Sequence, residues 1–346
     1  MHDMIRSVIL LLAAPVLCIC AGADDTLATL RAGGLVPVKT TQISMQKEDL
    51  RISPREIEVR YTFRNDSDKN VESIVEFPLP VIDGGDLYHV PIHFPSKDPV
   101  NFVDFRVWVN GAEVVPQVEI IARDASGHDV TAAVRAAGLP LTVDTHSFDA
   151  AVKNLAPDQL RRLTDSELLV DEGSSPRDFY WPTWALDVRF HWNQVFPANS
   201  TVEVRHVYKP IIGGSYLYLN AGEDAQDVKK TARTTLTPYC GTEKDAARAY
   251  AIAQKRQGQN GAGTNPGIYL YEKQIGFVLE TANNWKGPIG DFHLTVTTGG
   301  PDDIFATCAT GVTQTSPATY EVHRTNFSPD RDLDILILQT QGWDTN

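Results

Sequence analysis

The chain has 346 residues, of which 42% are hydrophobic, and carries a formal net charge of -13 at pH 7. This length supplies more apolar material than one ordinary core uses, so we expect two packed units. A surface this acidic repels phosphate backbones, so we expect no nucleic acid among the partners.

The first residues have the pattern of an export signal. Arg6 gives a short positive segment, residues 8–19 are almost wholly apolar, and residues 21–23 are small, as signal cleavage requires. We therefore predict a signal peptide over residues 1–23 and a periplasmic or secreted protein. The apolar run is too short for a permanent span, so no transmembrane anchor is expected after signal removal.

Residues 56–121 predict β-sheet. Apolar and polar side chains alternate in the first strand, which places the apolar set on one face. That set is Ile57, Val59, Tyr61 and Phe63. The run Phe77-Pro78-Leu79-Pro80 has two prolines without an N–H, so strand pairing should end there. Asn110-Gly111 predicts a tight turn between two strands.

A composition change predicts a helical insertion at about residues 126–178. Asp129 is placed to cap a helix over 130–137, and Pro157 suits a first helical position. Residues 164–167 have a capping-box pattern that predicts a further helix start before Leu168.

Sheet patterns return after residue 180. Residues 184–196 and 201–209 predict a hairpin, which would complete a β-sandwich unit over residues 24–215. Residues 216–346 predict a second, smaller β-rich unit with one helix at about 242–257, capped by Thr242. The expected fold is therefore mainly β.

The cysteines predict one disulfide bond. Cys18 and Cys20 lie in the predicted signal, which leaves Cys240 and Cys308 in an oxidising compartment. Two alternatives stay open: lipidation of Cys20, and a reactive Cys240 activated by a nearby helix N-terminus.

Four histidines have spacings or positions that raise the question of a metal site. His89 and His93 flank a proline, and an extended chain places them too far apart for one zinc ion. His191 and His206 fall on the two predicted hairpin strands but on opposite faces, so they should point apart. We expect His206 to be a hydrogen-bonded core residue.

No motif predicts a catalytic site. The chain has no G-x-S-x-G or H-E-x-x-H pattern, so we assign no catalytic residue, metal or cofactor. Asp330, Asp332 and Asp334 have the spacing that begins a calcium loop, but Ile335 and Gln341 stand where that loop needs glycine and glutamate. Acidic side chains on the solvent face of a strand are the alternative.

Aromatic side chains cluster in one short segment. They are Phe179, Tyr180, Trp181, Trp184, Phe190 and Trp192. Tyr180, Trp181 and Trp184 are candidates for a binding surface for a sugar or a protein partner; the alternative is a core wall packed against the helices.

Several landmarks resemble an uncharacterised family of exported bacterial proteins. They are Gly33-Gly34-Leu35, Glu48 to Ser53, Phe77 to Pro80, Trp192 to Pro197, Tyr239-Cys240 and Phe327 to Pro329. The family is a domain of unknown function, so the resemblance implies export and a sheet-rich fold but no activity.

Residues 56–120 and 189–211 are also similar to the vault/inter-alpha-trypsin type domain. The matching features are Phe63-Arg64-Asn65, Glu76 to Pro80, Phe105 to Gly111 and Phe196 to Tyr208. That resemblance implies a β-sandwich of the kind used in extracellular assemblies.

These patterns lead to two functional hypotheses. The first is a non-enzymatic envelope protein that binds or assembles with a protein or an envelope glycan through a shallow or edge surface. The alternative is an envelope glycan or peptide hydrolase, which needs a deep pocket with carboxylates about 5–10 Å apart.

Overall fold

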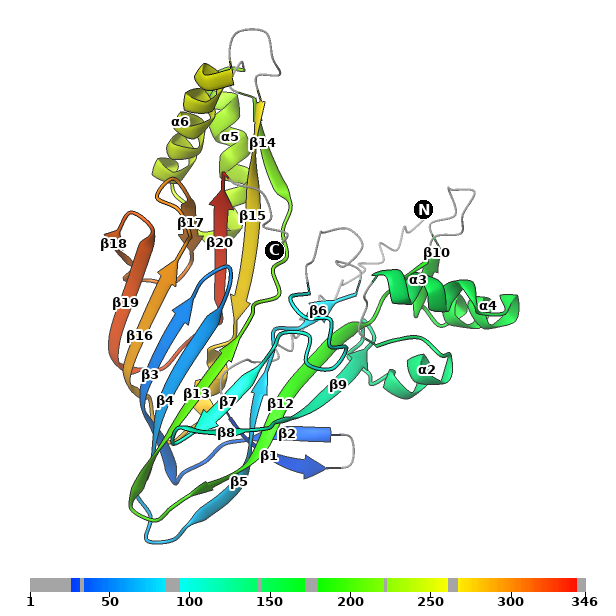
Figure 1. Ribbon diagram of the computed structural model, residues 1–346, viewed down its shortest axis with the longest axis vertical. Helices are drawn as coiled ribbons and strands as arrows, with labels where there is room; N and C mark the ends of the chain where they lie inside the picture. The colour runs from blue at the N-terminus through cyan, green and yellow to red at the C-terminus, as the bar shows by residue number, and fades with distance from the viewer. Residues whose placement is uncertain are drawn as a thin grey trace, which may run out of the picture.

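Figure 1 shows the computed structural model of the chain, which describes residues 26–31, 34–84, 94–141, 145–171, 180–220, 223–260 and 267–340. Two large β-sheets form a sandwich, and a third sheet with two helices rises beyond it. The mainly β prediction is confirmed. The predicted signal peptide lies outside the described residues.

The larger sheet of the sandwich has the strand order β18-β19-β16-β3-β4-β13-β7-β8. In chain order its strands are β3 (Ile43–Ile52), β4 (Ile57–Asn65), β7 (Arg106–Val109), β8 (Ala112–Val114), β13 (Ser200–Tyr208), β16 (Ile289–Thr297), β18 (Thr313–Ser316) and β19 (Thr319–Phe327). Asn110 and Gly111 join β7 to β8 with φ angles of 48° and 81°. Positive φ at both turn residues matches the right-handed twist of the strands, so the predicted hairpin is confirmed.

The opposing sheet has the order β2-β1-β5-β12-β6, with β9 also paired to β12. Its strands are β1 (Thr26–Arg31), β2 (Gly34–Val38), β5 (Val71–Pro78), β6 (Ile82–Asp83), β9 (Gln117–Arg123) and β12 (Ala185–Phe196). β5 ends at Pro78, as its missing N–H predicts. The N–H of Leu79 still donates a hydrogen bond of 2.8 Å to the carbonyl of Val188. This bond holds the residues that follow Pro78 beside β12.

The sandwich core is built from large aromatic side chains. The alternating residues of β4 are all buried, as their period of two predicts. Phe77 of β5 lies across from them, with its ring centroid 5.1 Å from that of Phe105 and 5.5 Å from that of Tyr208. His206 is fully buried among these rings, and burial lowers its pKa to about 3. Its predicted core position is confirmed.

The predicted hairpin of residues 184–196 and 201–209 is wrong. β12 pairs with β5, β6 and β9, whereas β13 pairs with β4 and β7 in the opposite sheet. The turn between them therefore crosses from one layer of the sandwich to the other. Alternation alone cannot distinguish a hairpin from two strands in opposite sheets, because the apolar and polar residues alternate in the same way in both arrangements.

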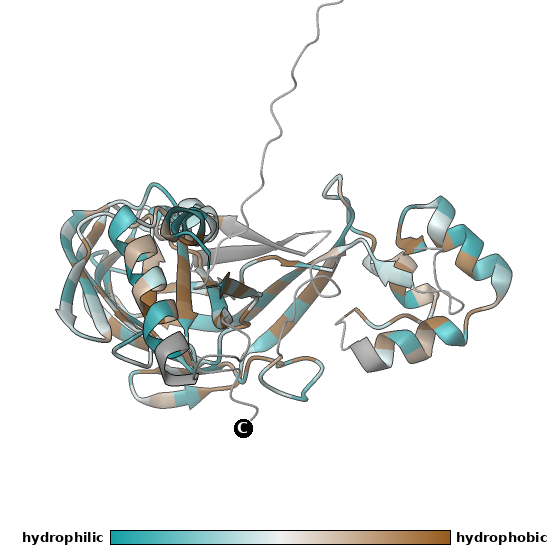
Figure 2. Ribbon diagram, turned by 90° about the horizontal axis from the view of Figure 1, so that it is seen from above, coloured by the Kyte–Doolittle hydropathy of each residue, from teal (hydrophilic) through white to brown (hydrophobic). Residues whose placement is uncertain are grey.

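The predicted helical insertion forms a separate group at one side of the sandwich (Figures 1 and 2). It contains α2 (Thr131–Ala136), α3 (Thr145–Lys153) and α4 (Pro157–Asp165). α2 begins at Thr131, so its N-cap is Val130 and not the predicted Asp129, although the carboxylate of Asp129 accepts the N–H of Thr131. α4 begins at Pro157, as predicted. The predicted helix start at residues 164–167 is wrong, because α4 ends there and Leu169–Asp171 forms β10, paired with β11 (Tyr180–Pro182).

The third sheet has the order β14-β15-β20-β17 and is covered on one face by two helices (Figure 1). Its elements are β14 (Tyr216–Asn220), β15 (Gly267–Phe277), β17 (Ile304–Thr307), β20 (Leu333–Gln339), α5 (Ala225–Leu236) and α6 (Glu243–Asn260). α6 begins directly after Thr242, which confirms that cap. α5 was not predicted, although Val228, Ala232 and Leu236 have the spacing of one helical face and are buried against the sheet.

The two predicted units share one sheet. β16, β18 and β19 come from the second unit, and β16 pairs in parallel with β3, with Leu294 opposite Leu50. The remaining strands of the second unit form the third sheet, whose inner residues continue the sandwich core. The division of the chain into units of residues 24–215 and 216–346 stays a prediction.

Candidate functional site

Cys240 and Cys308 form a disulfide bond, as predicted. Cys240 directly follows the short 3-10 helix η1 (Thr237–Tyr239), and Cys308 directly follows β17. The bond therefore fixes the end of α5 and η1 against the third sheet. It also excludes a free, reactive Cys240 in this structure.

The predicted binding aromatics lie mostly inside the protein. Trp184 is fully buried, with its ring centroid 5.9 Å from that of Phe148 of α3, and Trp181 is 8% exposed. Tyr180 on β11 is partly exposed. This burial supports the alternative of a core wall beneath the helices, and a binding role for the three residues stays a prediction.

The candidate metal ligands that the structure describes do not gather as a metal site. His89 and His93 lie outside the described residues. Asp332 accepts backbone N–H groups from Leu279 and Glu280, so it caps the start of the 3-10 helix η2 (Glu280–Asn284). Across the part of the chain that the structure describes, no three His, Cys, Asp or Glu side chains gather as a metal site.

A charged network lies on the outer face of the smaller sandwich sheet. The guanidinium of Arg189 contacts Asp187 at 2.8 Å and Glu76 at 3.8 Å, and Arg123 contacts Asp187 at 3.0 Å. Glu76 is fully buried, and this burial raises its pKa to about 7. The positive charges of Arg123 and Arg189 balance the negative charges of Asp187 and Glu76. This balance indicates that the network stabilises the fold. Sequence patterns gave no sign of it, because these residues belong to distant strands.

Three exposed tyrosines gather on the open face of the third sheet, and we name them the tyrosine patch. They are Tyr216 and Tyr218 of β14 and Tyr269 of β15, with exposed fractions of 56%, 38% and 46%. The ring of Tyr269 lies 5.1 Å from each of the other two rings. Within the described ranges, the other large aromatic side chains are buried or only partly exposed.

The patch follows from the alternation of β14. Leu217 and Leu219 point to the opposite face, where they are buried against the helices. The ring of Tyr218 packs over Gly267, where a side chain would collide with it. β14 is also the outermost strand of its sheet, and its sequence Tyr-Leu-Tyr-Leu-Asn has neither the charge nor the proline that usually protects an edge strand.

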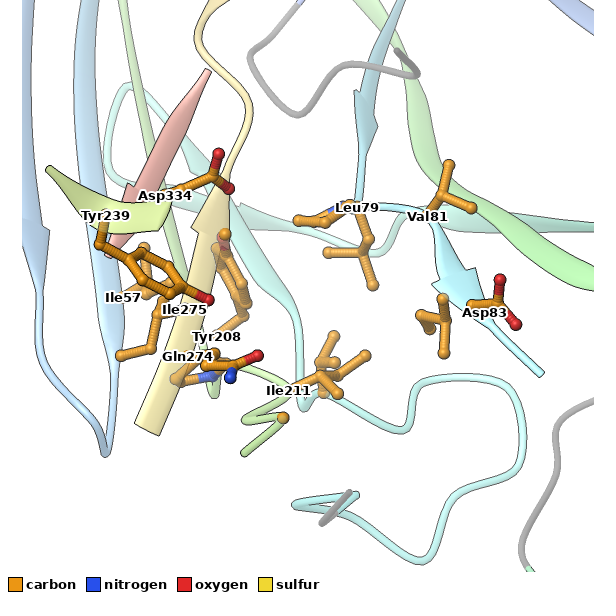
Figure 3. A pocket seen from close by; sticks show the side chains of 16 residues that line it. Ile57, Leu79, Val81, Asp83, Tyr208, Ile211, Tyr239, Gln274, Ile275 and Asp334 are labelled. Carbon is orange, nitrogen blue, oxygen red and sulfur yellow. The ribbon is translucent and has the colours of Figure 1, made fainter. Parts of the chain in front are cut away.

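A pocket of about 380 Å³ lies where the three sheets meet, and we name it the junction pocket (Figure 3). Leu79 and Pro80 of the predicted Phe-Pro-Leu-Pro run form part of its wall, since the strand ends there and leaves space beside it. The ends of β13 and η1 contribute Tyr208 and Tyr239, and the third sheet contributes Gln274 of β15. Aliphatic side chains such as Ile57 and Ile275 also line the pocket, and polar and apolar atoms contribute almost equally to its surface.

The pocket has negative charge at two places. Of the residues that line it, the charged ones are Asp83 and Asp334, which lie at opposite ends in Figure 3. Burial together with the carboxylates of Asp334 and Glu272 raises the pKa of Tyr239 to about 12.

Tyr208 carries a buried hydroxyl in the wall of this pocket. The residue is 3% exposed, and its hydroxyl has no hydrogen-bond partner within the described part of the chain. Burial raises the pKa of the phenol, so the hydroxyl stays protonated. An unpaired buried hydroxyl is uncommon in proteins, but this one has almost no solvent-accessible surface, so a molecule in the pocket would meet the ring of Tyr208 and not its oxygen.

Neither the tyrosine patch nor the junction pocket was predicted. The patch has a sequence signal, since Tyr216 and Tyr218 alternate with leucines as Tyr269 and Tyr271 do on β15. The pocket has none, because its wall comes from segments between residues 57 and 334.

No helix in the described ranges is both long and apolar enough to cross a membrane. A comparison with curated proteins gives no match. The similarity to the vault/inter-alpha-trypsin type domain stays a prediction.

Among solved structures, a crystal structure described as a "putative nutrient binding protein" from Legionella pneumophila is similar at 15% identity. The alignment covers 91% of this chain and 72% of that one, with a TM-score of 0.39. A family model matches residues 23–336, and the chain therefore belongs to the family described as "Domain of unknown function (DUF4424)", in agreement with the family of unknown function expected from the sequence.

Proposed function

We propose that this protein is a non-enzymatic exported module that binds a protein partner through the tyrosine patch beside β14. The observation that carries the proposal is the concentration of exposed aromatic side chains on one open sheet face. Tyrosine is enriched at protein interfaces, because its ring adds apolar contact area and its hydroxyl still forms hydrogen bonds.

A protein fits the tyrosine patch better than an envelope glycan. Sugar rings stack on flat aromatic platforms, whereas the ring planes of Tyr216 and Tyr269 are inclined by 83° and those of Tyr218 and Tyr269 by 48°. Such a corrugated surface suits interlocking side chains. The chain carries a net charge of -13, so the complementary partner is one with a positively charged rim around an apolar centre.

The geometry gives less support to the alternative of a hydrolase. Glycan hydrolysis needs two carboxylates close together across the scissile bond. The two aspartates of the junction pocket lie at opposite ends of it, with apolar side chains such as Leu79 between them (Figure 3).

Export is part of the proposal and rests on two features. The first 23 residues have the signal pattern, and the Cys240–Cys308 bond suits an oxidising compartment. We infer a periplasmic or secreted location. Mass spectrometry of the protein from a cell-envelope fraction tests this inference, and a chain that still begins at Met1 would contradict it.

The partner is identified by photo-crosslinking in intact cells. A photoreactive amino acid placed at Tyr216 should give a discrete adduct with one basic protein. The matched control is Val195 of β12, whose side chain is also exposed, with an exposed fraction of 45%. Val195 lies on the smaller sandwich sheet and not on the third sheet. An equal adduct from both positions would contradict a specific surface.

Binding is then measured with the purified partner. Truncation of buried interface tyrosines commonly costs 2 kcal/mol or more, so Tyr216→Ser and Tyr269→Ser should each weaken the affinity about thirtyfold. Val195→Ser should leave the affinity unchanged. Unaltered affinity in the tyrosine variants, or saturable binding of purified envelope glycan that these variants abolish, would overturn the assignment of a protein partner.

A further inference from the structure

The edge strand β14 offers a partner its main chain as well as its tyrosine rings. Among the strands that the structure describes, β14 pairs with β15 alone. Just before β14, the carbonyl of Ser215 accepts the N–H of Glu272 of β15 over 2.9 Å. Bonding and non-bonding residues alternate in an antiparallel pair, so Leu217 also bonds to β15. The backbone N–H and C=O of Tyr216 therefore point away from β15, toward the open edge of the sheet.

This direction of the main chain limits how a protein can cover the patch. A partner that packed only on the rings would bury the backbone groups of Tyr216 without replacing their bonds to water, which is costly. An extended segment that runs beside β14 supplies a C=O and an N–H for them, as added strands do at other sheet edges.

The charges at one end of β14 indicate the chemistry of that segment. Glu223, Asp224 and Asp227 follow β14 directly and are exposed at the start of α5. Asp224 caps this helix by accepting the N–H of Gln226. Neither Glu223 nor Asp227 forms an ion pair within the part of the chain that the structure describes. Carboxylates at this end attract a cationic side chain.

We propose that the partner of the tyrosine patch adds an extended segment to the third sheet as a further strand beside β14. This inference rests on the proposed function, since it describes how the same partner binds. The segment exchanges main-chain hydrogen bonds with Tyr216, and its alternate apolar side chains pack against the rings of Tyr216 and Tyr218. A lysine or arginine of the segment lies beside Glu223 and Asp227.

Three capped, fluorescently labelled peptides test this inference by anisotropy with the purified protein. The first has the sequence Lys-Arg-Val-Thr-Val-Thr-Val, the second has Glu-Glu in place of Lys-Arg, and the third is the first with N-methyl groups on every valine and threonine. The first should bind saturably, and the second about threefold or more weakly through the reversed charges. The third should not bind, because it lacks the N–H groups that a strand needs. Equal binding of the first and third peptides would overturn the proposal.

Two variants of Tyr216 separate the main chain from the ring. Tyr216→Ser and Tyr216→Pro both remove the ring, but only proline also removes the N–H that points away from β15. Edge strands tolerate proline on their open side, so the pairing with β15 should persist, and urea unfolding checks this. Tyr216→Pro should bind the first peptide about three- to tenfold more weakly than Tyr216→Ser through loss of one hydrogen bond.

The two variants also distinguish failure of this inference from failure of the proposed function. Equal affinities of Tyr216→Ser and Tyr216→Pro, both below that of the wild type, would refute strand addition and leave the tyrosine patch as the binding surface. A Tyr216→Ser variant that binds the purified partner as tightly as the wild type would refute the patch itself. If Tyr216→Pro does not fold, the N-methylated peptide decides the question alone.

The charge of the segment is tested at the start of α5. Glu223→Gln combined with Asp227→Asn should remove the preference for the first peptide over the second. The control is Asp330→Asn, which removes a negative charge from a side chain that is 81% exposed and lies outside β14 and α5. Loss of the preference in the control would show general attraction to an acidic protein and refute the charge assignment.

A second copy of the chain is the other occupant that an open edge strand admits. Sedimentation velocity of the purified wild type should show a monomer. A stable dimer that Tyr216→Pro dissociates would show that β14 pairs with β14 of another copy, and it would overturn the assignment of the edge to a different protein.

Discussion

The sandwich and the third sheet cover their strands in different ways. In the sandwich, each sheet covers the other, so large rings such as Phe77 and Phe105 are buried between them. In the third sheet, α5 and α6 cover one face, where small residues such as Ala232 and Ala249 allow close packing. The sheet extends beyond the sandwich (Figure 1). Its other face carries the tyrosine patch.

This difference separates the residues that stabilise the fold from those for which we propose a binding role. Aromatic side chains in the sandwich contribute to folding, because their area leaves water when the two sheets meet. The tyrosines of the third sheet are exposed, and we propose that a partner covers them. The junction pocket lies between the two regions, where the end of β5 leaves space that neither packing arrangement fills.

The largest expected effect is in the sandwich core. Phe77→Ala should lower the free energy of unfolding by about 3–5 kcal/mol, because it removes a buried ring and leaves a cavity. Tyr216→Ala in the tyrosine patch should change it by no more than about 0.5 kcal/mol. Urea unfolding measures both, and similar losses would remove the contrast between the two regions.

The next effect concerns the third sheet. Replacing Cys240 and Cys308 together by serine should lower the free energy of unfolding by about 2–4 kcal/mol, because the bond closes a long loop in the unfolded chain. The reduced wild type provides the comparison, since it should match the double variant. A variant as stable as the oxidised wild type would show that the third sheet does not need this bond.

The smallest of the three stability effects depends on pH and tests the outer face of the sandwich. Burial raises the pKa of Glu76 to about 7, against the opposing effect of Arg189 and with the support of Asp187 and Glu119. The folded chain therefore holds a proton that the unfolded chain releases above pH 4.5. The free energy of unfolding should thus fall as the pH rises from 4.5 through 7, by up to about 3 kcal/mol.

Glu76→Gln should remove this pH dependence, because the amide does not titrate. Glu72→Gln is the control, since Glu72 lies on the same strand but is exposed. Denaturant unfolding at pH 5 and pH 8 measures the slope. A stability that rises with pH in the wild type would show instead that the ion pair with Arg189 dominates.

Short-range sequence patterns predicted much of the fold. The alternation of β4, the end of β5 at Pro78, the Asn110-Gly111 turn and the start of α4 at Pro157 all depend on the backbone preferences of neighbouring residues. These preferences act within a few residues, so one sequence is enough to read them.

Errors occurred where a local pattern had two outcomes. The residues before Leu168 match a helix start, yet they end α4, and Glu167 adopts a positive φ of 56°. The strands around Asn199 fit a hairpin, yet they enter opposite sheets. In the first case, local hydrogen bonds such as that from the N–H of Leu168 to the carbonyl of Leu163 close the helix. In the second case, pairing with distant strands decided the result.

The sequence by itself determined strands with clear alternation such as β4, the apolar set of that strand that can be buried, and the two cysteines that can pair. Only the tertiary structure decided that β16 lies beside β3, that Trp184 faces the core, and that Asp83 and Asp334 share a pocket. The reason is physical. Side-chain alternation follows from backbone geometry within each strand, whereas the neighbour of a strand depends on the apolar area that the whole chain buries.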